Sequence, residues 1–390
     1  MINGAFVDRG PRRRAAAGLL TVVAIALALA CGLPSAQPSG NAPAGGASAG
    51  SAPDGASPSN PPAAGGSAGA AAQAAQSAPA APAEPVKLRV AYSEVYPGAT
   101  IPWTTYEAGI FAKHGLDVDL SYVASSQTVP AVIANEVDIS LGGGYAVINS
   151  RLAGSDLQMF LGVVNFYQYE LMVNPDIAGP ADLKGQKLGV SRFGSASDQA
   201  TRVLLQQFGL VPDQDVVLIQ TGSMQERVAA MQAGAVAGGV AAPPDPTRLR
   251  RLGFKSLYDL SKSGQQDLNS IAFASQAWLR SHEATVQAFV DAMVEGVHYA
   301  KTNRPFAEQV LKKYLQMDDD ELLNDSYEMY VGANLARVPD PGREAAQRYL
   351  EEQAATDPRA VGARLDDFFD VRFVDKVNTS GLVPQLYGKD

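Results

Sequence analysis

The chain has 390 residues, of which 18% are charged, and its formal net charge at pH 7 is −9. That length exceeds what one hydrophobic core usually serves, so we expect more than one folding unit. A nucleic-acid partner would require a basic face, and an acidic chain without a basic stripe excludes that class of protein.

The first thirty residues have the pattern of an export signal. Three arginines at 12–14 precede an apolar run at 15–30, which is shorter than the roughly 20 residues that a membrane span needs. The run ends at Cys31, the only cysteine of the sequence. A cysteine at this junction resembles a bacterial lipobox and predicts a lipidated N-terminus, although the lipobox leucine is replaced by Ala28. The alternative is ordinary cleavage before Cys31, which would leave a free thiol. Both alternatives place the protein outside the cytoplasmic membrane.

Residues 31–85 consist almost entirely of Ala, Gly, Ser and Pro and contain no aromatic side chain. Such a composition buries too little apolar surface to offset the entropy of ordering the chain. We therefore expect a disordered tether with a mean reach of about 40 Å, which would hold a folded body away from a membrane.

From residue 86, short alternating or apolar segments alternate with helical patterns. Strands are expected at 87–92, 116–122, 137–141, 157–164, 187–190 and 216–220. Helices are expected at 103–114, from the hydroxyls of 125–127, from the glycines of 142–144 to 152, at 197–208, and from 221–223 to 234. Strands that alternate with helices predict βαβ units on mostly parallel sheets.

After residue 275 the pattern becomes helical. Apolar residues at 286–297 fall on one face, Pro305 opens a second helix, Asp318 and Glu321 resemble a capping box for a third, and Asp340 precedes a fourth. We expect this tail to pack on the first of two α/β lobes. The predicted domains are a signal at 1–30, the tether at 31–85, a first lobe at 86–180 and 276–390, and a second lobe at 181–275.

Four segments together resemble one protein family. They are residues 107–118, 135–139, 182–197 and 370–374. Their order and spacing are similar to those of substrate-binding proteins of ABC importers, of the sulfonate/nitrate/taurine type, which are related to thiamine-pyrimidine binding proteins. The resemblance covers residues 86–390, and one departure is Ala237, where the family often has Asp.

The resemblance implies a type II periplasmic-binding-protein-like fold, in which two lobes close over a small-molecule ligand. It also implies an ABC permease and its ATPase as partners, and a small, anionic organic solute as ligand. No cofactor is expected. We further expect a monomer that touches the membrane through its lipid anchor only, in the periplasm or at the cell surface.

Ligands of open α/β sheets bind beyond the carboxyl ends of the strands, which selects loop residues as candidates. The candidates are Ser93, Tyr96, Trp103, Ser125, Ser126, Gly143, Gly144, Tyr145, Phe166, Tyr167, Arg192, Gly194, Ser195, Ser197, Thr221 and Asp245. Arg192 with the hydroxyls of Ser195 and Ser197 is expected to bind an anion at a helix N-terminus. The alternatives are that the serines only cap the helix, that Arg192 forms a surface ion pair, and that some of the aromatic residues are ordinary core.

The sequence lacks the signatures of catalysis. The histidines at 114, 282 and 298 lack metal-ligand spacing, and no G-x-S-x-G motif is present. The glycines of 142–144 are not followed by the Lys of a nucleotide-binding loop. We therefore expect no enzyme, no catalytic residue and no metal. The alternatives are a cytoplasmic-type enzyme of the same fold, such as a pyrimidine synthase or a menaquinone-pathway dehydratase, and an extracytoplasmic sensor domain.

Overall fold

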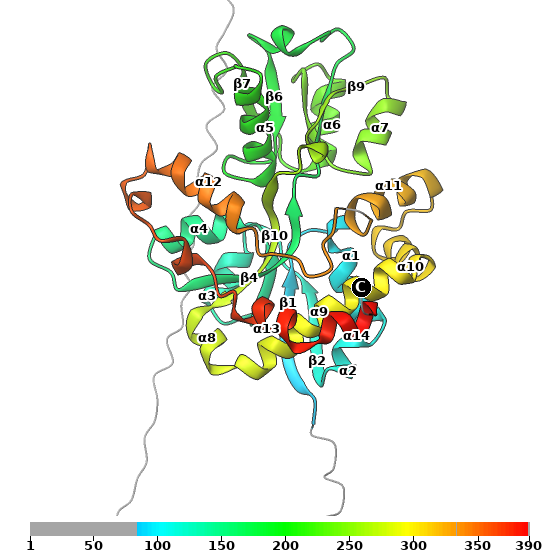
Figure 1. The fold of residues 1–390 in the computed structure, drawn as a ribbon. Helices are drawn as coiled ribbons and strands as arrows, with labels where there is room; N and C mark the ends of the chain where they lie inside the picture. The colour runs from blue at the N-terminus through cyan, green and yellow to red at the C-terminus, as the bar shows by residue number, and fades with distance from the viewer. Residues whose placement is uncertain (1–83, 333, 389–390) are drawn as a thin grey trace, which may run out of the picture. The chain divides into compact units, whose positions relative to one another are not determined.

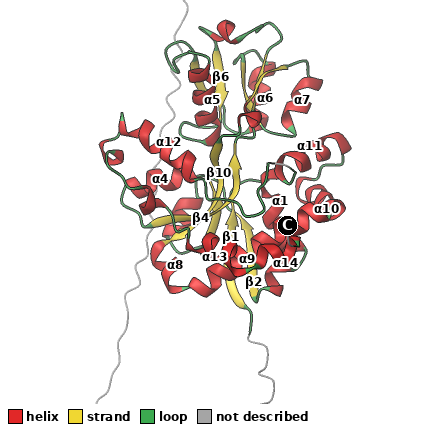
Figure 2. Cartoon of the chain, viewed as in Figure 1, coloured by secondary structure: helices red, strands yellow, loops and turns green. Residues whose placement is uncertain are grey.

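The computed structural model describes residues 84–332 and 334–388. The predicted signal, Cys31 and the tether therefore lie outside the described residues. The described residues form two α/β lobes, each built on a five-stranded sheet (Figures 1 and 2).

The sheet of the first lobe has the strand order β2-β1-β3-β10-β4. Its strands are β1 (Val86–Tyr92), β2 (Leu116–Tyr122), β3 (Ile139–Gly142), β4 (Leu157–Phe166) and β10 (Gln266–Ser275). β1 pairs in parallel with β2 and β3, whereas β10 is antiparallel to both β3 and β4. All strands except β10 thus run in one direction.

The sheet of the second lobe has the equivalent order β7-β6-β8-β5-β9. Its strands are β5 (Glu170–Val173), β6 (Lys187–Val190), β7 (Val217–Gln220), β8 (Gly238–Ala241) and β9 (Lys255–Asp259). β6 is parallel to β7 and β8, and β5 is antiparallel to β8 and β9. The predicted mostly parallel sheets are therefore confirmed, each with one antiparallel strand.

The antiparallel strand of each sheet is the one that the chain forms on arriving from the other lobe. The chain passes from β4 to β5 through residues 167–169 and returns from β9 to β10 through residues 260–265. These two segments, here called the hinge segments, differ from the predicted lobe boundaries at 180/181 and 275/276. Neither β5 nor β10 was expected, because their sheet membership depends on pairing with strands far away in the sequence.

Helices cover both sheets. The helices of the first lobe are α1 (Thr100–Glu107), α2 (Ile110–Lys113), α3 (Thr128–Ile133), α4 (Gly144–Leu152), α8 (Gln276–Ser281), α9 (Glu283–Thr302), α10 (Arg304–Leu315), α11 (Asp320–Tyr330), α12 (Arg343–Ala354), α13 (Arg372–Ser380) and α14 (Leu382–Tyr387). Those of the second lobe are α5 (Ala196–Gln207), α6 (Met224–Gln232) and α7 (Asp245–Arg251).

The helical tail packs on the first lobe, as expected (Figure 1). Phe289 on α9 stacks on Phe111 of α2 with ring centroids 5.6 Å apart, and it meets the edge of Phe160 on β4. Phe373 on α13 contacts the same Phe160 ring. A single apolar core therefore joins the first sheet to helices that lie more than a hundred residues further along the chain.

Several predicted helix starts and ends differ from the structure. The helix expected at 103–114 is interrupted at Gly109, which adopts a left-handed conformation (φ 69°) that glycine tolerates without steric cost. The cap of α11 is Asp319, one residue later than expected, and its carboxylate accepts from two backbone N–H groups. α3 begins after Gln127 without the predicted hydroxyl cap.

None of the helices in residues 84–332 and 334–388 is long and apolar enough to span a bilayer.

Candidate ligand-binding cleft

A cavity of about 570 Å³ lies between the two lobes. Its wall is formed by loops that follow β1, β2 and β3 in the first lobe and β6, β7 and β8 in the second. Two residues of the first hinge segment, Gln168 and Tyr169, and Asn269 on β10 also line it. The carboxyl ends of the parallel strands of both sheets thus meet at one cavity, as the rule for open α/β sheets requires. Its volume suits a small organic molecule.

Ten of the predicted site residues line this cavity. They are Ser93, Tyr96, Ser125, Gly143, Tyr145, Arg192, Gly194, Ser195, Ser197 and Asp245. Contact between these residues and a ligand stays a prediction.

Three predicted aromatic residues do not reach the cavity. Trp103 is fully buried and stacks on Tyr314 with ring centroids 4.5 Å apart, because the inner face of α1 points to α10. Phe166 packs against the core of the first lobe, and Tyr167 is buried in the core of the second. These three aromatic side chains therefore belong to the hydrophobic cores of the lobes, which was the alternative to ligand contact.

Three predicted polar or glycine positions also lie elsewhere. Ser126 is exposed outside the cavity. Gly144 opens α4 against Leu268, where an added Cβ would be 3.0 Å from the leucine side chain. The Thr221 hydroxyl donates to the Val190 carbonyl at 3.1 Å and so closes the turn after β7.

The predicted anion loop is ordered by its own hydrogen bonds. The Ser195 hydroxyl caps α5 by accepting from the Asp198 N–H at 3.4 Å, and it donates to the Arg192 carbonyl at 2.7 Å. The Ser197 hydroxyl accepts from the Ser191 N–H at 2.9 Å. The Arg192 side chain is exposed and forms no ion pair with any residue described here.

The arginine that lies deepest in the cavity wall was not predicted. Arg227 on α6 is only 2% exposed, and its guanidinium donates to the Val240 carbonyl at 2.7 Å and to the Ser191 hydroxyl at 2.8 Å. Its Nε has no hydrogen-bond partner, and no carboxylate of residues 84–332 or 334–388 pairs with it. Burial lowers the pKa of Arg227, and electrostatic interactions with Tyr169, Asp245 and Glu94 oppose that shift.

Two strand glycines make room for this arginine. A Cβ at Gly189 on β6 would lie 3.0 Å from Arg227 Cγ, and one at Gly239 on β8 would lie 2.7 Å from Arg227 Cδ. Either contact would force the arginine to move. Glycine inside a strand often marks a close approach, so these glycines together with an arginine on α6, the helix that precedes β8, are a signal that sequence reasoning could have used.

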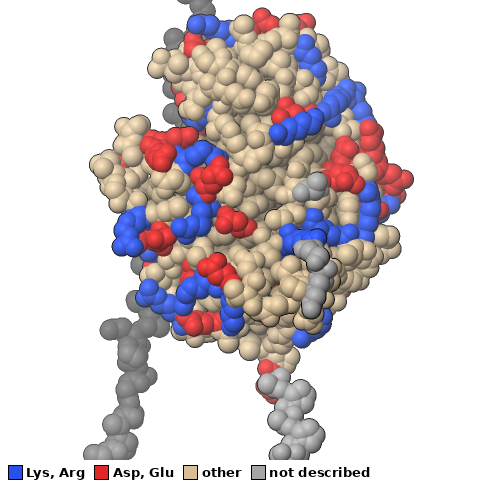
Figure 3. Space-filling model, in the orientation of Figure 1, with Lys and Arg blue, Asp and Glu red and all other residues tan. Residues whose placement is uncertain are grey.

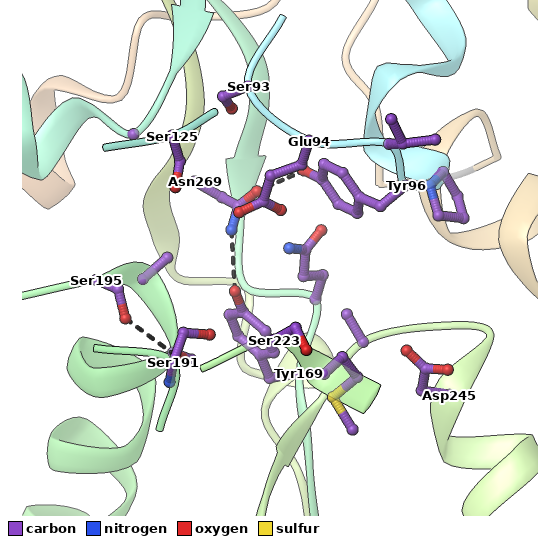
Figure 4. Close-up of a pocket in the computed structure, with 18 of the residues that line it drawn as sticks. Ser93, Glu94, Tyr96, Ser125, Tyr169, Ser191, Ser195, Ser223, Asp245 and Asn269 are labelled. Atoms are coloured by element: carbon purple, nitrogen blue, oxygen red, sulfur yellow. Dashed lines mark hydrogen bonds between the residues drawn. The ribbon is translucent and has the colours of Figure 1, made fainter. Parts of the chain in front are cut away.

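The opposite wall carries hydrogen-bond acceptors and tyrosines. The Tyr96 hydroxyl donates to Asn269 Oδ1 at 2.5 Å, and Asn269 Nδ2 donates to the Tyr169 hydroxyl at 2.9 Å (Figure 4). Burial raises the pKa of both tyrosines, so their hydroxyls stay neutral at physiological pH. Glu94 and Gln168 complete this wall, and neither was among the predicted residues.

Both carboxylates of the cavity wall have raised pKa values. Glu94 is open to the cavity, but the protein that surrounds the cleft reduces its hydration and raises its pKa, against the opposing effect of Arg227 and Arg192. Burial also raises the pKa of Asp245, which pairs with Arg248 at 2.9 Å. The cavity wall contains neither histidine nor cysteine.

Helices α7 and α11 connect the two lobes beside the cavity. Arg251 on α7 forms ion pairs with Asp319, at 2.6 Å, and with Glu321. The Thr247 hydroxyl donates to Asp325 at 2.5 Å. Figure 3 shows basic side chains over α7 next to acidic ones over α11. These contacts hold the lobes together with no contribution from a ligand.

We expect replacement of Arg251 by alanine to shift the protein toward a more open cleft. The ion pairs at α7 and α11 are exposed, so 1 M salt should screen them and act on the wild type in the same direction. Small-angle scattering should then show a small increase in the radius of gyration. Arg359→Ala removes an ion pair that lies within the first lobe, with Asp357 at 2.7 Å, and serves as the control. Equal radii for all three proteins would contradict this role of α7 and α11.

A family model described as "NMT1/THI5 like" matches residues 103–305, slightly more than half of the chain. The chain therefore belongs to the NMT1/THI5-like family. A search of curated proteins found no match.

Solved structures confirm the expected periplasmic-binding-protein-like fold. The periplasmic aliphatic sulphonate binding protein SsuA of Escherichia coli is 19% identical, with 70% of this chain and 94% of that chain covered and a TM-score of 0.56. The periplasmic nitrate-binding protein NrtA of Synechocystis PCC 6803 is 15% identical, with 77% and 90% covered and a TM-score of 0.62. The alkanesulfonate-binding protein SsuA of Xanthomonas axonopodis pv. citri, bound to MOPS, is 16% identical, with 73% and 96% covered and a TM-score of 0.58.

Proposed function

We propose that this protein is an extracytoplasmic solute-binding protein that captures a small anionic organic solute and delivers it to an ABC permease and its ATPase. The family, the fold and a cavity between two lobes support a binding role. The sulfonate- and nitrate-binding proteins that share the fold make a sulfonate or a related oxyanion the first solute class to test. Binding without turnover is part of the proposal.

The observation that carries the proposal is the buried guanidinium of Arg227. A charge that leaves water is costly unless it is paired, and no carboxylate of the described residues pairs with this one. An anion in the cavity would supply the missing charge. The hydroxyls of Ser191 and Ser197 lie beside the guanidinium, at 2.8 Å and 3.5 Å from Nη2. We therefore propose Arg227 as the principal anion contact, with Arg192 near the rim.

A bound solute should stabilise the folded protein without being consumed. We expect a solute at a hundredfold excess over its Kd to raise the free energy of unfolding by about 2.7 kcal/mol. Thermal unfolding with alkanesulfonates, carboxylates and nitrate would identify the class that binds. Mass spectrometry of the solute recovered afterwards should return the unchanged compound. A chemically altered product would instead support the enzyme alternative.

We further propose that Cys31 carries a lipid and that residues 31–85 tether the binding body to the membrane as a monomer. Cells grown with an alkyne fatty acid should yield tagged wild-type protein, because the modified cysteine follows the export signal. Cys31→Ser should abolish the tag without changing the thermal stability of the body. An untagged wild-type protein with a free thiol would show that ordinary cleavage occurs instead.

A further inference from the structure

The two walls of the cavity carry unpaired charged groups of opposite sign. The wall of the second lobe presents donors, namely the guanidinium of Arg227, the hydroxyl of Ser191 and the side chain of Arg192. The wall of the first lobe and the hinge presents acceptors. Glu94 follows β1, and its carboxylate points into the cavity (Figure 4).

The protein supplies no hydrogen-bond donor to the Glu94 carboxylate. Glu94 forms no hydrogen bond or ion pair with the part of the chain that the structure describes. Gln168 is 1% exposed, and its Oε1 is buried without a hydrogen-bond partner. Asp245 differs from both, because Arg248 already pairs with it at 2.9 Å. The Glu94 carboxylate therefore faces the cavity unpaired, whereas the Gln168 amide oxygen is buried and not exposed to it.

Glu94 and Arg227 do not satisfy each other. The charge of each side chain shifts the pKa of the other across the cavity, but no ion pair within 4.0 Å joins them. A purely anionic solute bound at Arg227 would be repelled by the Glu94 carboxylate. A purely cationic solute would leave the guanidinium without an acceptor. A solute with both kinds of group would pair with both walls.

We propose that the solute is amphoteric, with an acidic group bound at Arg227 and an ammonium or other cationic N–H group bound by Glu94. The inference rests on the proposed function and narrows its solute class. Tyr96 lies near Glu94 in the cavity wall and suits a cation next to the organic body of such a solute (Figure 4). Closure of the lobes would then bring both charged ends of the solute onto their partners at once.

Matched pairs of probes that differ only in the amine test this proposal. The first pair is 3-aminopropanesulfonate and propanesulfonate, and the second is 4-(aminomethyl)benzenesulfonate and 4-methylbenzenesulfonate. Calorimetry should show that the amine-bearing member of at least one pair binds to the wild type at least tenfold more tightly. In Glu94→Gln that preference should shrink to threefold or less, while binding of the plain sulfonate is unchanged or tighter.

Glu136→Gln is the matched control, since this exposed carboxylate lies outside the cavity and its replacement changes the net charge equally. It should retain the wild-type preference. Equal or tighter binding of the plain sulfonates, or an amine preference that survives in Glu94→Gln, would overturn the amphoteric assignment and leave the proposed function standing. Failure of all four probes to bind would count against the assignment and the proposed function together.

Discussion

Replacement of Arg227 by methionine is expected to weaken binding of an anionic solute on the order of a hundredfold or more. Hydrogen bonds to charged groups contribute roughly 1.5–3 kcal/mol each, and every 1.4 kcal/mol is about tenfold in affinity. The loss of two hydrogen bonds between the Arg227 guanidinium and the solute should therefore weaken binding by more than the loss of an exposed residue at the rim, such as Arg192. Calorimetry with the sulfonate that binds best to the wild type measures the change.

The free protein should tolerate this substitution. Methionine is flexible and apolar and can occupy the space beside Gly189 and Gly239, and the buried uncompensated charge disappears with the arginine. The hydrogen bonds to Val240 and Ser191 are lost at the same time, so we expect little net change in the thermal midpoint of the free protein. Arg280→Met removes an exposed charge on α8 and should bind like the wild type. Wild-type affinity in Arg227→Met would contradict the proposed anion contact.

Replacement of Asp267 by asparagine is expected to change how stability depends on pH. Asp267 lies at the start of β10, directly after a hinge segment, and it is fully buried. The Tyr145 hydroxyl donates to its Oδ1 at 2.7 Å, and its Oδ2 has no partner. Burial raises the pKa of Asp267 to about 7, against the opposing effects of the Tyr145 hydrogen bond, the Leu268 N–H and the charge of Arg348.

The sign of the effect follows from proton binding. The folded state holds the Asp267 proton up to about pH 7, whereas the unfolded chain loses it near pH 4. The stability that the neutral carboxyl provides is therefore present below pH 4 and is lost as the pH rises toward 7. A shift of about three pKa units corresponds to on the order of 4 kcal/mol above pH 7.

The asparagine variant stays neutral at every pH. In urea unfolding at pH 5 to 8, the wild type should lose stability relative to Asp267→Asn as the pH rises, and the variant should be the more stable protein at pH 8. Asp117→Asn, which alters an exposed carboxylate on β2, is the control. Parallel curves of stability against pH for wild type and Asp267→Asn would contradict a raised pKa of Asp267 in the folded protein.

Much of the fold and part of the cavity follow from local sequence patterns. Helix α5 begins at the Ser195 cap and is followed by Gly209, and α6 begins at Ser223, whose hydroxyl forms a reciprocal capping box with Glu226. Helix caps, turns and the alternation of apolar and polar residues in strands depend on residues a few positions apart, so they can be predicted without a structure. Since parallel strands bring their carboxyl ends together, the loops after them could be assigned to one cavity in advance.

The export pattern, the acidic composition, the two βαβ series and the helical tail were therefore determined by the sequence alone. Only the tertiary structure decided that β5 and β10 are the antiparallel strands that follow each crossing between the lobes, because antiparallel pairing with distant strands leaves no local periodicity. The tertiary structure also decided which charged side chains lie in the cavity wall. Arg227 on α6 is buried there because Gly189 on β6 and Gly239 on β8 leave space for it. Whether a polar side chain is solvated, paired or left facing a cavity depends on neighbours remote in the chain, and this is why Glu94, Gln168 and Arg227 emerged only from the folded protein.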